Sequence, residues 1–495
     1  MSVTPSRQIV YQIFPERFAI GRGLTGKEKL SQAAYQRPGN ILKADWQARP
    51  AEDDAELKQC GQVFYGGDLQ GITERLDYIQ ESGFNTLYFT PIFDAPSNHK
   101  YDAMDFFRID PMFGDEAALK RLIAELDKRG MGLILDAVLN HVNYQHPWFL
   151  AAKRGEQPYR DFFTFDKAGN HLCWWGHPYL AELNLDNPEL QSILFAGERN
   201  FLSHYLEMGI TGWRFDTAQD LGMKTAERIR QSIHRRFPHA QLLGELMSYA
   251  GGWVNGRGYT GMMNYYFREA MLAWLAGDIA HQQANAAMRE YYDGYGHEGS
   301  LNSWLMLGSH DTMRLRTAIP DVRLRQLAVA AQFTLPGIPL VYYGDENGME
   351  GGNDPDCRRP MVWDEAQWER PMRDFIQTLV GIREANAALQ NGKLMMLGEK
   401  QTGNALIYLR YTDVPGQLAL VVLNLGDAPL RELVFIPYPH LYNSVPLRNQ
   451  LAPGNEIKMG GGCIWVEAPP KGVAIYTPFE PHAHFRFYKE RNLVV

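Results

Sequence analysis

Two charged residues, Arg214 and Asp216, stand out in this 495-residue sequence as a pair that could support catalysis. They end the run Gly-Trp-Arg-Phe-Asp (212–216), which is typical of a buried strand. Residues two apart on a strand share a face, so the guanidinium and the carboxylate should emerge side by side, with Phe215 turned away. An adjacent Arg keeps a carboxylate ionised and oriented, as a nucleophile requires. The alternative is a structural ion pair that caps the strand, which is more common for an isolated Arg-x-Asp.

The elements that would position this pair form a regular α/β alternation. Eight short runs are almost continuously apolar, which predicts strands of a parallel sheet that is covered on both faces. These runs are residues 9–14, 86–91, 132–138, 212–216, 241–245, 261–266, 303–308 and 339–344. Helical spacing of apolar residues predicts helices over residues 71–82, 116–128, 188–208, 225–237 and 322–333, with a last helix ending near Asn386. Eight strands with intervening helices predict a (β/α)8 barrel.

Two further parts accompany the predicted barrel. Residues 141–183 break the alternation and are rich in aromatic residues, which predicts a subdomain inserted after the third strand. The C-terminal region has short strands separated by Gly, Pro and Asp turns, as in an antiparallel β-sandwich. The predicted domains are a catalytic barrel (1–140 and 184–390), an inserted subdomain (141–183) and a C-terminal β domain (391–495). The polar segment 19–62 has no clear period and is interpreted as a long loop.

The carboxyl ends of the strands form the rim where the active sites of such barrels lie. Several acidic side chains should converge there, which is costly unless chemistry requires it. Each alone would more often be a helix N-cap or a structural residue. Glycoside hydrolysis uses two carboxyl groups, one of which is protonated while the other is ionised. The rim candidates are Asp136, Asp216, Glu245 and Asp311, together with His99, Tyr101, Asp102, Asn140, His141, Arg214 and His310.

The composition argues against several other classes of function. The net charge of −8 is spread along the chain without a basic stripe, so nucleic acid is not an expected partner. The most apolar later stretch, 327–343, is broken by Pro and Gly, which argues against a membrane span. The four cysteines lie far apart and suggest neither a disulfide framework nor a zinc site. No signal-peptide core precedes the first strand, so we expect a cytoplasmic protein, although a leader already removed would leave the same sequence.

Four segments, in the expected order, resemble the conserved segments of the α-amylase family of glycoside hydrolases (family 13). They are residues 136–141, residues 212–216, the surroundings of Glu245, and residues 309–311. The resemblance covers almost the whole chain. It implies that the aromatic insertion and the terminal β domain correspond to domains B and C of that family.

The resemblance also implies a retaining mechanism. Asp216 would attack the anomeric carbon, Glu245 would protonate the leaving oxygen and then activate water, and Asp311 would stabilise the transition state. Retention implies that the carboxyl groups of Asp216 and Glu245 lie about 5–5.5 Å apart. Apolar surroundings and the nearby Asp216 would raise the pKa of Glu245, and Arg214 would keep Asp216 ionised.

Four more positions are implied to bind the sugar. Tyr101 would stack on the sugar at the cleavage subsite, while His141 and His310 would hydrogen-bond its hydroxyl groups. Asp102, next to Tyr101 in the same loop, is a further candidate for substrate binding.

Finer stretches are similar to the cyclomaltodextrinase, neopullulanase and maltogenic amylase branch of the family. They are residues 64–72, 97–102, 307–312 and 353–358. In this branch the last of these loops supplies an Asp and an Arg to the glucose at the cleavage subsite, which implies that role for Asp354 and Arg358. A salt-bridged surface turn is the alternative for these two residues.

Three departures from the branch bear on assembly, specificity and metal binding. The branch usually carries an N-terminal β domain that helps to build a dimer, whereas the first barrel strand is expected here at Ile9, so a monomer and a homodimer both stay open. Residues 219–220 are Gln-Asp where the branch usually has Asn-Glu, on the side of the leaving group. Residues 18–23 lack the Asn/Asp run that binds calcium in many relatives, and Asp68 alone cannot hold an ion that takes six to eight oxygens. Asn140 matches a calcium ligand of classical amylases, so calcium stays possible, but we expect no essential cofactor or metal.

The favoured function is a cytoplasmic hydrolase of α-1,4-glucosidic bonds in maltooligosaccharides, cyclodextrins or related α-glucans, with α-1,6 bonds as an open second specificity. A transglycosylase or sugar isomerase would use the same covalent intermediate and pass it to a sugar rather than to water. A third alternative is a non-catalytic carbohydrate-binding homologue. Such proteins typically lose the nucleophile or the acid, whereas all three carboxylates are present here.

Overall fold

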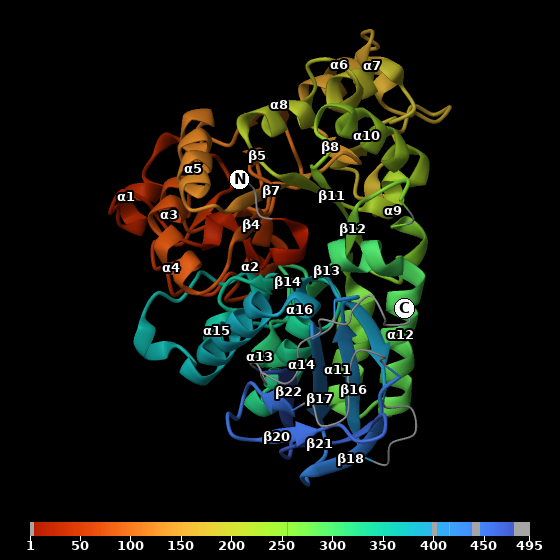
Figure 1. The fold of residues 1–495 in the computed structure, drawn as a ribbon. Helices are drawn as coiled ribbons and strands as arrows, with labels where there is room; N and C mark the ends of the chain where they lie inside the picture. The colour runs from red at the N-terminus through yellow and green to blue at the C-terminus, as the bar shows by residue number, and fades with distance from the viewer. Residues whose placement is uncertain (1–3, 255, 398–402, 415, 438–445, 480–495) are drawn as a thin grey trace.

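Eight parallel strands close into a barrel in the computed structural model (Figure 1), which describes residues 4–254, 256–397, 403–414, 416–437 and 446–479. The strands are β1 (Val10–Ile13), β4 (Thr86–Phe89), β7 (Gly132–Ala137), β10 (Gly212–Phe215), β11 (Gln241–Leu246), β12 (Gly261–Asn264), β13 (Trp304–Met306) and β14 (Ile338–Tyr342). Their order around the barrel is β1-β14-β13-β12-β11-β10-β7-β4, and β4 pairs with β1 to close it. The predicted (β/α)8 barrel is confirmed.

Alternate residues of each strand point into the barrel or outward to the helices. Outward residues, including Trp213 and Phe215, join the large core under the helices. Phe215 therefore faces away from its neighbours Arg214 and Asp216, as the strand pattern predicts. The inward apolar residues form a separate small core cluster: Val10, Tyr88, Ile134, Leu243, Met263, Tyr265, Trp304, Met306, Ile338 and Leu340.

The helices around the barrel match the predicted periodicity in most places. They are α3 (Leu69–Glu74), α4 (Leu76–Glu81), α5 (Glu116–Lys128), α7 (Pro188–Gln191), α8 (Phe201–Met208), α9 (Ala218–Leu221), α10 (Met223–Arg236), α11 (Tyr265–Ala276), α12 (His281–Asn302), α13 (Leu315–Ala318), α14 (Val322–Thr334), α15 (Arg370–Ala385) and α16 (Ala387–Asn391). The single helix predicted over 188–208 is wrong. A π-helical turn (Ser192–Ala196) follows α7, and Asn200 starts α8 by accepting a hydrogen bond from the Ser203 amide.

The aromatic-rich insertion follows the carboxyl end of β7, and in Figure 1 it lies at the opposite end of the molecule from the blue C-terminal strands. Its elements are β8 (His141–Asn143), α6 (Pro147–Lys153) and β9 (Leu180–Glu182), with His141 paired to Glu182. The polar segment 19–62 is less irregular than expected. It contains α1 (Gly26–Leu30), α2 (Asp54–Lys58) and β2 (Ile41–Leu42), which pairs with β3 (Val63–Phe64). A second small hairpin pairs β5 (Phe93–Asp94) with β6 (Asp105–Ile109).

The C-terminal strands form two antiparallel sheets around one shared core, which confirms the predicted sandwich. One sheet has the order β15 (Lys393–Met396), β16 (Ala405–Tyr411), β17 (Leu418–Asn424), β22 (Gly472–Pro478), β19 (Pro446–Asn449) and β20 (Glu456–Lys458). The other pairs β18 (Leu430–Phe435) with β21 (Cys463–Ala468). Strands β17 and β22 pack against α14 of the barrel. Within the described residues, no helix has the length and apolarity needed to cross a membrane.

Candidate active site

The inward faces of three adjacent strands bring four charged residues together. On β10, Arg214 pairs in register with Asp136 of β7 on one side and with Leu243 of β11 on the other. Asp216 follows Arg214 by two residues and Glu245 follows Leu243 by two, so both lie one step closer to the rim on the same inward face. The period of the strands therefore places these side chains in one group.

Arg214 is the centre of this group. Its guanidinium is fully buried and lies between three carboxylates. The Nη1 atom lies 2.9 Å from Asp136 Oδ2 and 3.0 Å from Asp216 Oδ1, and the Nη2 atom lies 2.5 Å from Glu245 Oε1. One guanidinium therefore faces three carboxyl groups, so acidic groups outnumber basic groups around the buried Arg214.

Asp136 is the most firmly held of the three acids. Arg214 Nη1 contacts both of its oxygens, and the hydroxyl groups of Tyr88 and Tyr101 donate to Oδ2 at 2.7 and 3.0 Å. Its side chain is fully enclosed. Because its oxygens are occupied by protein donors, Asp136 orients Arg214 and Tyr101 and is not itself available to a substrate.

Burial raises the pKa of Asp216 well above its ordinary value, and the charge of Glu245 raises it further while Arg214 opposes the shift. Burial also raises the pKa of Glu245, again against Arg214. Arg214 lowers the pKa of Asp216 as expected, but burial and the charge of Glu245 outweigh it, so the expected net lowering of that pKa is wrong. The physical reason is that the carboxyl group is buried and shares one guanidinium with two other acids. The raised pKa expected for Glu245 is present.

Thr217, directly after Asp216, has the left-handed backbone conformation (φ 43°, ψ 51°), which is uncommon for a β-branched residue. This turn directs its amide N–H toward Glu245 Oε2, at 3.1 Å. Strained backbone of this kind costs about 1–3 kcal/mol and gathers at functional sites. Here it links the ends of β10 and β11 and fixes the orientation of Glu245.

Asp311 joins the group from the loop after β13. Burial raises its pKa, but His310, Arg358 and Arg214 outweigh burial, and the net pKa is lowered. Arg358 Nη2 lies 3.0 Å from Asp311 Oδ1, and Arg358 Nη1 lies 3.0 Å from Asp354 Oδ1. The loop 353–358 therefore reaches the site, and its Arg is nearly buried rather than part of a surface turn.

Tyr101 and His310 form the next layer of the site. Their rings are parallel within 2°, with centroids 5.5 Å apart, and the Tyr101 hydroxyl lies 2.6 Å from His310 Nε2. Burial lowers the pKa of His310 to about 3, so the ring is neutral near pH 7. Gln12 Nε2 lies 2.7 Å from Nδ1 of that ring, so with Gln12 donating, Nε2 carries the proton and donates toward Tyr101.

His141 also faces this group, whereas Asp102 does not. His141 Nε2 lies 3.1 Å from the Tyr101 carbonyl oxygen, and burial lowers the pKa of His141 to about 4. Asp102 accepts hydrogen bonds from the Ser97 hydroxyl and from Asn143 Nδ2 at 3.0 Å. Both of its oxygens are thus engaged, and it fastens the loop after β4 to β8.

The site therefore combines acids with raised pKa values, Asp216 and Glu245, and an acid with a lowered pKa, Asp311, on one barrel rim. Residues 12–390 match the sequence profile described as "Alpha amylase, catalytic domain". This match covers most of the chain.

The chain belongs to the α-amylase family.

Several α-amylase family members are similar along most of this glycosidase. It is 36% identical over 428 residues to neopullulanase 2 of Thermoactinomyces vulgaris, which covers 84% of this chain and 69% of the relative. It is 35% identical over 428 residues to a cyclomaltodextrinase of a Bacillus species, covering 84% and 72%. Among solved structures, the ligand-free cyclic α-maltosyl-(1→6)-maltose hydrolase of Arthrobacter globiformis has a TM-score of 0.78 at 28% identity and covers 96% of this chain and 99% of its own.

Sequence reasoning missed three side chains of this α-amylase family site. Gln12 and Tyr88 lie on the inward faces of β1 and β4, and a polar residue inside the apolar run 9–14 was a usable signal for the first. Trp174 of the insertion stacks on His141, with centroids 5.2 Å apart and an interplanar angle of 29°. Nothing in the spacing of the sequence connects Trp174 to the barrel, because the insertion has little regular structure.

The calcium ion that many family members bind near Asp68 does not fit the residues here. Asp68 Oδ1 accepts from the amides of Gly21 and Gly71, at 3.1 and 2.7 Å. Asp68 Oδ2 lies 2.5 Å from the ammonium group of Lys29, and both side chains are buried. A cation of this chain thus already neutralises the carboxylate. Among the described residues, no group of three or more His, Cys, Asp or Glu side chains could hold a metal ion.

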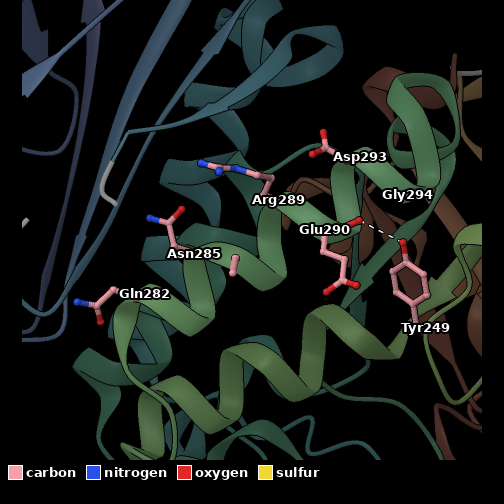
Figure 2. Close-up of a pocket in the computed structure, with 8 residues that line it drawn as sticks. Tyr249, Gln282, Asn285, Arg289, Glu290, Asp293 and Gly294 are labelled. Atoms are coloured by element: carbon pink, nitrogen blue, oxygen red, sulfur yellow. Dashed lines mark hydrogen bonds between the residues drawn. The ribbon is translucent and has the colours of Figure 1, made fainter. Parts of the chain in front are cut away.

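A surface hollow of about 790 Å³ lies away from the carboxylates, on one face of α12 (Figure 2). Tyr249 closes one side of it, and the Tyr249 hydroxyl donates to the Glu290 carbonyl oxygen at 3.2 Å. None of the acids around Arg214 lines this hollow. Its size therefore does not mark the catalytic centre, which is identified by the charges at the barrel rim.

Proposed function

We propose that this protein is a retaining glycoside hydrolase that cleaves α-1,4-glucosidic bonds in maltooligosaccharides, cyclodextrins or related α-glucans. The observation that carries the proposal is the sharing of Arg214 by Asp216 and Glu245. Both acids bind protons more tightly than exposed carboxylic acids, so the pair retains a proton as the pH rises above the ordinary range of a carboxylic acid. One acid can then be the nucleophile while the other holds the proton that the leaving group needs.

In the first step, a carboxylate oxygen of Asp216 forms a bond to the anomeric carbon as the glycosidic C–O bond breaks. Glu245 gives its proton to the leaving oxygen, and the Thr217 amide holds the carboxylate that results. Asp311, kept ionised by Arg358, faces the positive charge that develops on the sugar ring. In the second step, Glu245 takes a proton from water, the water oxygen bonds to the anomeric carbon, and Asp216 is released.

The sugar would be held by the side chains around this pair. Tyr101 offers a ring stacked on His310, and the neutral rings of His141 and His310 hold Tyr101 at its carbonyl and hydroxyl groups beside the space for the sugar. Asp354 and Arg358 would bind the same glucose from the loop after β14, because Arg358 already bridges Asp354 to Asp311. These roles agree with the positions of the residues around Arg214.

The substrate class is supported by the names of the relatives. Neopullulanase, cyclomaltodextrinase and a hydrolase of cyclic α-maltosyl-(1→6)-maltose are the proteins to which this chain is similar, so α-1,6 bonds are a second bond type to test. We also propose a cytoplasmic location. It is supported by the similarity to an enzyme of Bacillus subtilis named intracellular maltogenic amylase, 36% identical over 395 residues.

A product time course on maltotriose, β-cyclodextrin, pullulan and starch, followed by NMR of the first anomer released, tests the proposal. We expect hydrolysis of at least one α-1,4-linked substrate, with the α-anomer appearing first. The β-anomer appearing first would exclude a retaining mechanism. Products that are mostly longer than the starting sugar would show that transfer, not hydrolysis, is the main reaction.

A further inference from the structure

A cavity of about 400 Å³ lies beside the loop that connects β14 to α15. This volume is within the range of about 300–1,000 Å³ that ligand pockets usually have. Three tryptophans line the cavity, Trp46, Trp363 and Trp368, so we name it the tryptophan pocket. Trp46 comes from the polar segment 19–62 and the other two from the loop before α15, so only the folded chain brings the three indoles together.

The three indole rings are partly buried and held in fixed orientations. The guanidinium groups of Arg75 and Arg373 lie over Trp363 and Trp368, at 4.2 and 4.9 Å from the ring centroids. Because these hydrogen bonds and cation contacts are made within the protein, the indoles present rigid apolar surface to the pocket and lose little conformational entropy when a ligand binds. The Nε1 atoms all donate to main-chain carbonyl oxygens at 2.8 Å: Trp46 to Met361, Trp363 to Phe18 and Trp368 to Val362.

Polar side chains complete the wall of the tryptophan pocket. Gln47 and Gln367 line it and are exposed, and their amides can both donate and accept hydrogen bonds. Arg316 Nε lies 3.2 Å from Glu350 Oε1, and this pair has no net charge. Aromatic rings with a few polar groups of both kinds suit a neutral ligand that has an apolar face and many hydroxyl groups. A pyranose has this chemistry.

Two consecutive arginines show that the tryptophan pocket is separate from the catalytic site. Arg358 points to Asp311, with Nη2 and Oδ1 3.0 Å apart. The next residue, Arg359, lines the tryptophan pocket and binds Asp356 through two contacts, at 2.8 and 2.6 Å. Neither Arg358 nor any of the acids around Arg214 lines the tryptophan pocket. One short segment of the loop therefore contributes to two different cavities.

We propose that the tryptophan pocket is a second, non-catalytic binding site for glucose units of an α-glucan. The proposal rests on the proposed function, because that function supplies the class of sugar. The apolar face of a glucose ring would pack on the indoles, and its hydroxyl groups would meet Gln47, Gln367 and the pair of Arg316 and Glu350.

The consequence concerns the length of the bound glucan. Maltotriose should titrate the tryptophan pocket and the catalytic site as two independent sites. A glucan long enough to occupy both should bind more tightly than either site alone allows, because binding at one site raises the effective concentration of the chain at the other. The tryptophan pocket would thus favour long chains without any part in the chemical step.

The first experiment observes the tryptophan pocket by ¹⁹F NMR. The Asp216→Asn variant, which cannot form the glycosyl ester, is labelled with 5-fluorotryptophan and titrated with maltotriose. Replacement of each lining tryptophan by phenylalanine assigns its resonance. We expect the resonances of Trp46, Trp363 and Trp368 to shift along one saturable curve. The curve should persist when Tyr101→Ala is added to weaken the catalytic site.

Two variants then test the wall of the tryptophan pocket. Trp46→Ala should raise the dissociation constant of maltotriose at this pocket about tenfold, through loss of ring contact, as read from the two remaining resonances. The double variant Gln47→Ala/Gln367→Ala should raise it about fivefold, through loss of hydrogen bonds. In otherwise wild-type protein, both should leave kcat on maltotriose unchanged, which excludes a general effect on folding.

Electrophoresis in gels that contain soluble starch tests the binding of long chains. In the Asp216→Asn background, Trp46→Ala should raise the apparent dissociation constant for starch about fivefold. Trp465→Ala is the matched control, because it removes a half-exposed indole from the C-terminal sheet, and it should change neither measurement.

The possible failures are distinguishable. Absence of hydrolysis of every α-1,4-linked substrate by the wild-type protein would contradict the proposed function. Hydrolysis without a shift of the three resonances, at maltotriose concentrations that saturate turnover, would overturn the tryptophan pocket as a sugar site alone. Shifts that disappear with Tyr101→Ala would show that the tryptophan pocket is not a separate site, and would also overturn the proposal.

Discussion

The two ends of the barrel hold buried guanidinium groups in opposite ways. At the carboxyl end, Arg214 lies among three carboxylates, which outweigh burial and raise its pKa. At the amino end, Arg383 and Arg410 donate to main-chain carbonyls, including those of Gly337 and Thr334, and to no carboxylate among the described residues. Burial lowers the pKa of Arg383 to about 9 and that of Arg410 to about 10.

The two kinds of partner, carbonyl groups and carboxylates, allow different chemistry at the two ends. Carbonyl groups are neutral and do not titrate, so Arg383 can only join chain segments, here the ends of α14 and α16 and the entry to β14. An excess of carboxylates leaves protons that can be taken up and released. The group around Arg214 can therefore perform acid–base chemistry, whereas the amino end of the barrel serves packing against the C-terminal sheets.

The largest effect is expected when the proposed nucleophile at the carboxyl end of the barrel is removed. Asp216→Asn should lower kcat on maltooligosaccharides by about four orders of magnitude, the scale seen when a catalytic unit loses one essential member. The amide keeps the shape of the side chain but cannot form the glycosyl ester. Steady-state kinetics and circular dichroism measure both aspects. Turnover close to that of the wild type would contradict the assignment of the nucleophile.

Replacing one buried arginine at each end of the barrel by methionine tests the comparison. Arg383→Met should lower the free energy of unfolding by about 3–5 kcal/mol, because buried carbonyls lose their donor, while kcat per folded molecule stays near the wild-type value. Arg214→Met should abolish kcat. Urea unfolding and active-site titration distinguish the two. An equal loss of kcat in both variants would show that the two ends do not differ in function.

The pH dependence of stability tests the raised pKa values of the acids at the carboxyl end. The pKa values of Asp216 and Glu245 are raised in the folded state, so this pair favours folding at low pH and loses that contribution as the pH rises through the raised values. Asp216→Asn should therefore melt at a higher temperature than the wild type at pH 7, by an amount that vanishes near pH 4. Scanning calorimetry over that range measures it. A lower melting temperature for the variant at pH 7 would contradict the raised pKa.

The smallest effect concerns a third arrangement, the one-to-one pair of Lys29 and Asp68. Because the ammonium group occupies the carboxylate, we expect a chelator such as EDTA to change neither the melting temperature nor the activity. Calcium added back should likewise have no effect. A chelator-induced loss of stability that calcium reverses would show that another part of the chain binds the ion.

The barrel could be predicted from sequence because its strands are short apolar runs with fixed alternation. The same alternation predicted that Arg214 and Asp216 share one face, and the position of barrel active sites at the carboxyl ends of the strands predicted that Glu245 lies near them. The helices α11 and α12 were missed, and Tyr265 and Tyr266 were assigned to a strand although they begin α11. An apolar stretch that joins a strand to a buried helix has no change of period at the junction, so the boundary is invisible in the sequence.

Other parts of the site could not be predicted because they depend on long-range contacts of irregular segments. The Trp174–Asp220 hydrogen bond joins residues 46 positions apart, one of them in a turn without a sequence signature. The division of the Arg214 charge among three acids is likewise a property of the assembled rim. Together with burial, it reversed the expected direction of the Asp216 pKa. The sequence predicted that Asp216 lies near Arg214 and Glu245, but not that Arg214 also contacts Asp136 and Glu245.

The most direct test of the catalytic role of the carboxyl end is to trap the intermediate. Glu245→Gln, which lacks the base for the second step, is mixed with α-maltosyl fluoride, which needs no acid in the first step, and the protein is digested for mass spectrometry. The expected result is a maltosyl adduct on the peptide that carries Asp216, absent from the Asp216→Asn/Glu245→Gln double variant. An adduct on another carboxylate, or fluoride release without any adduct together with release of the β-anomer, would contradict Asp216 as the nucleophile.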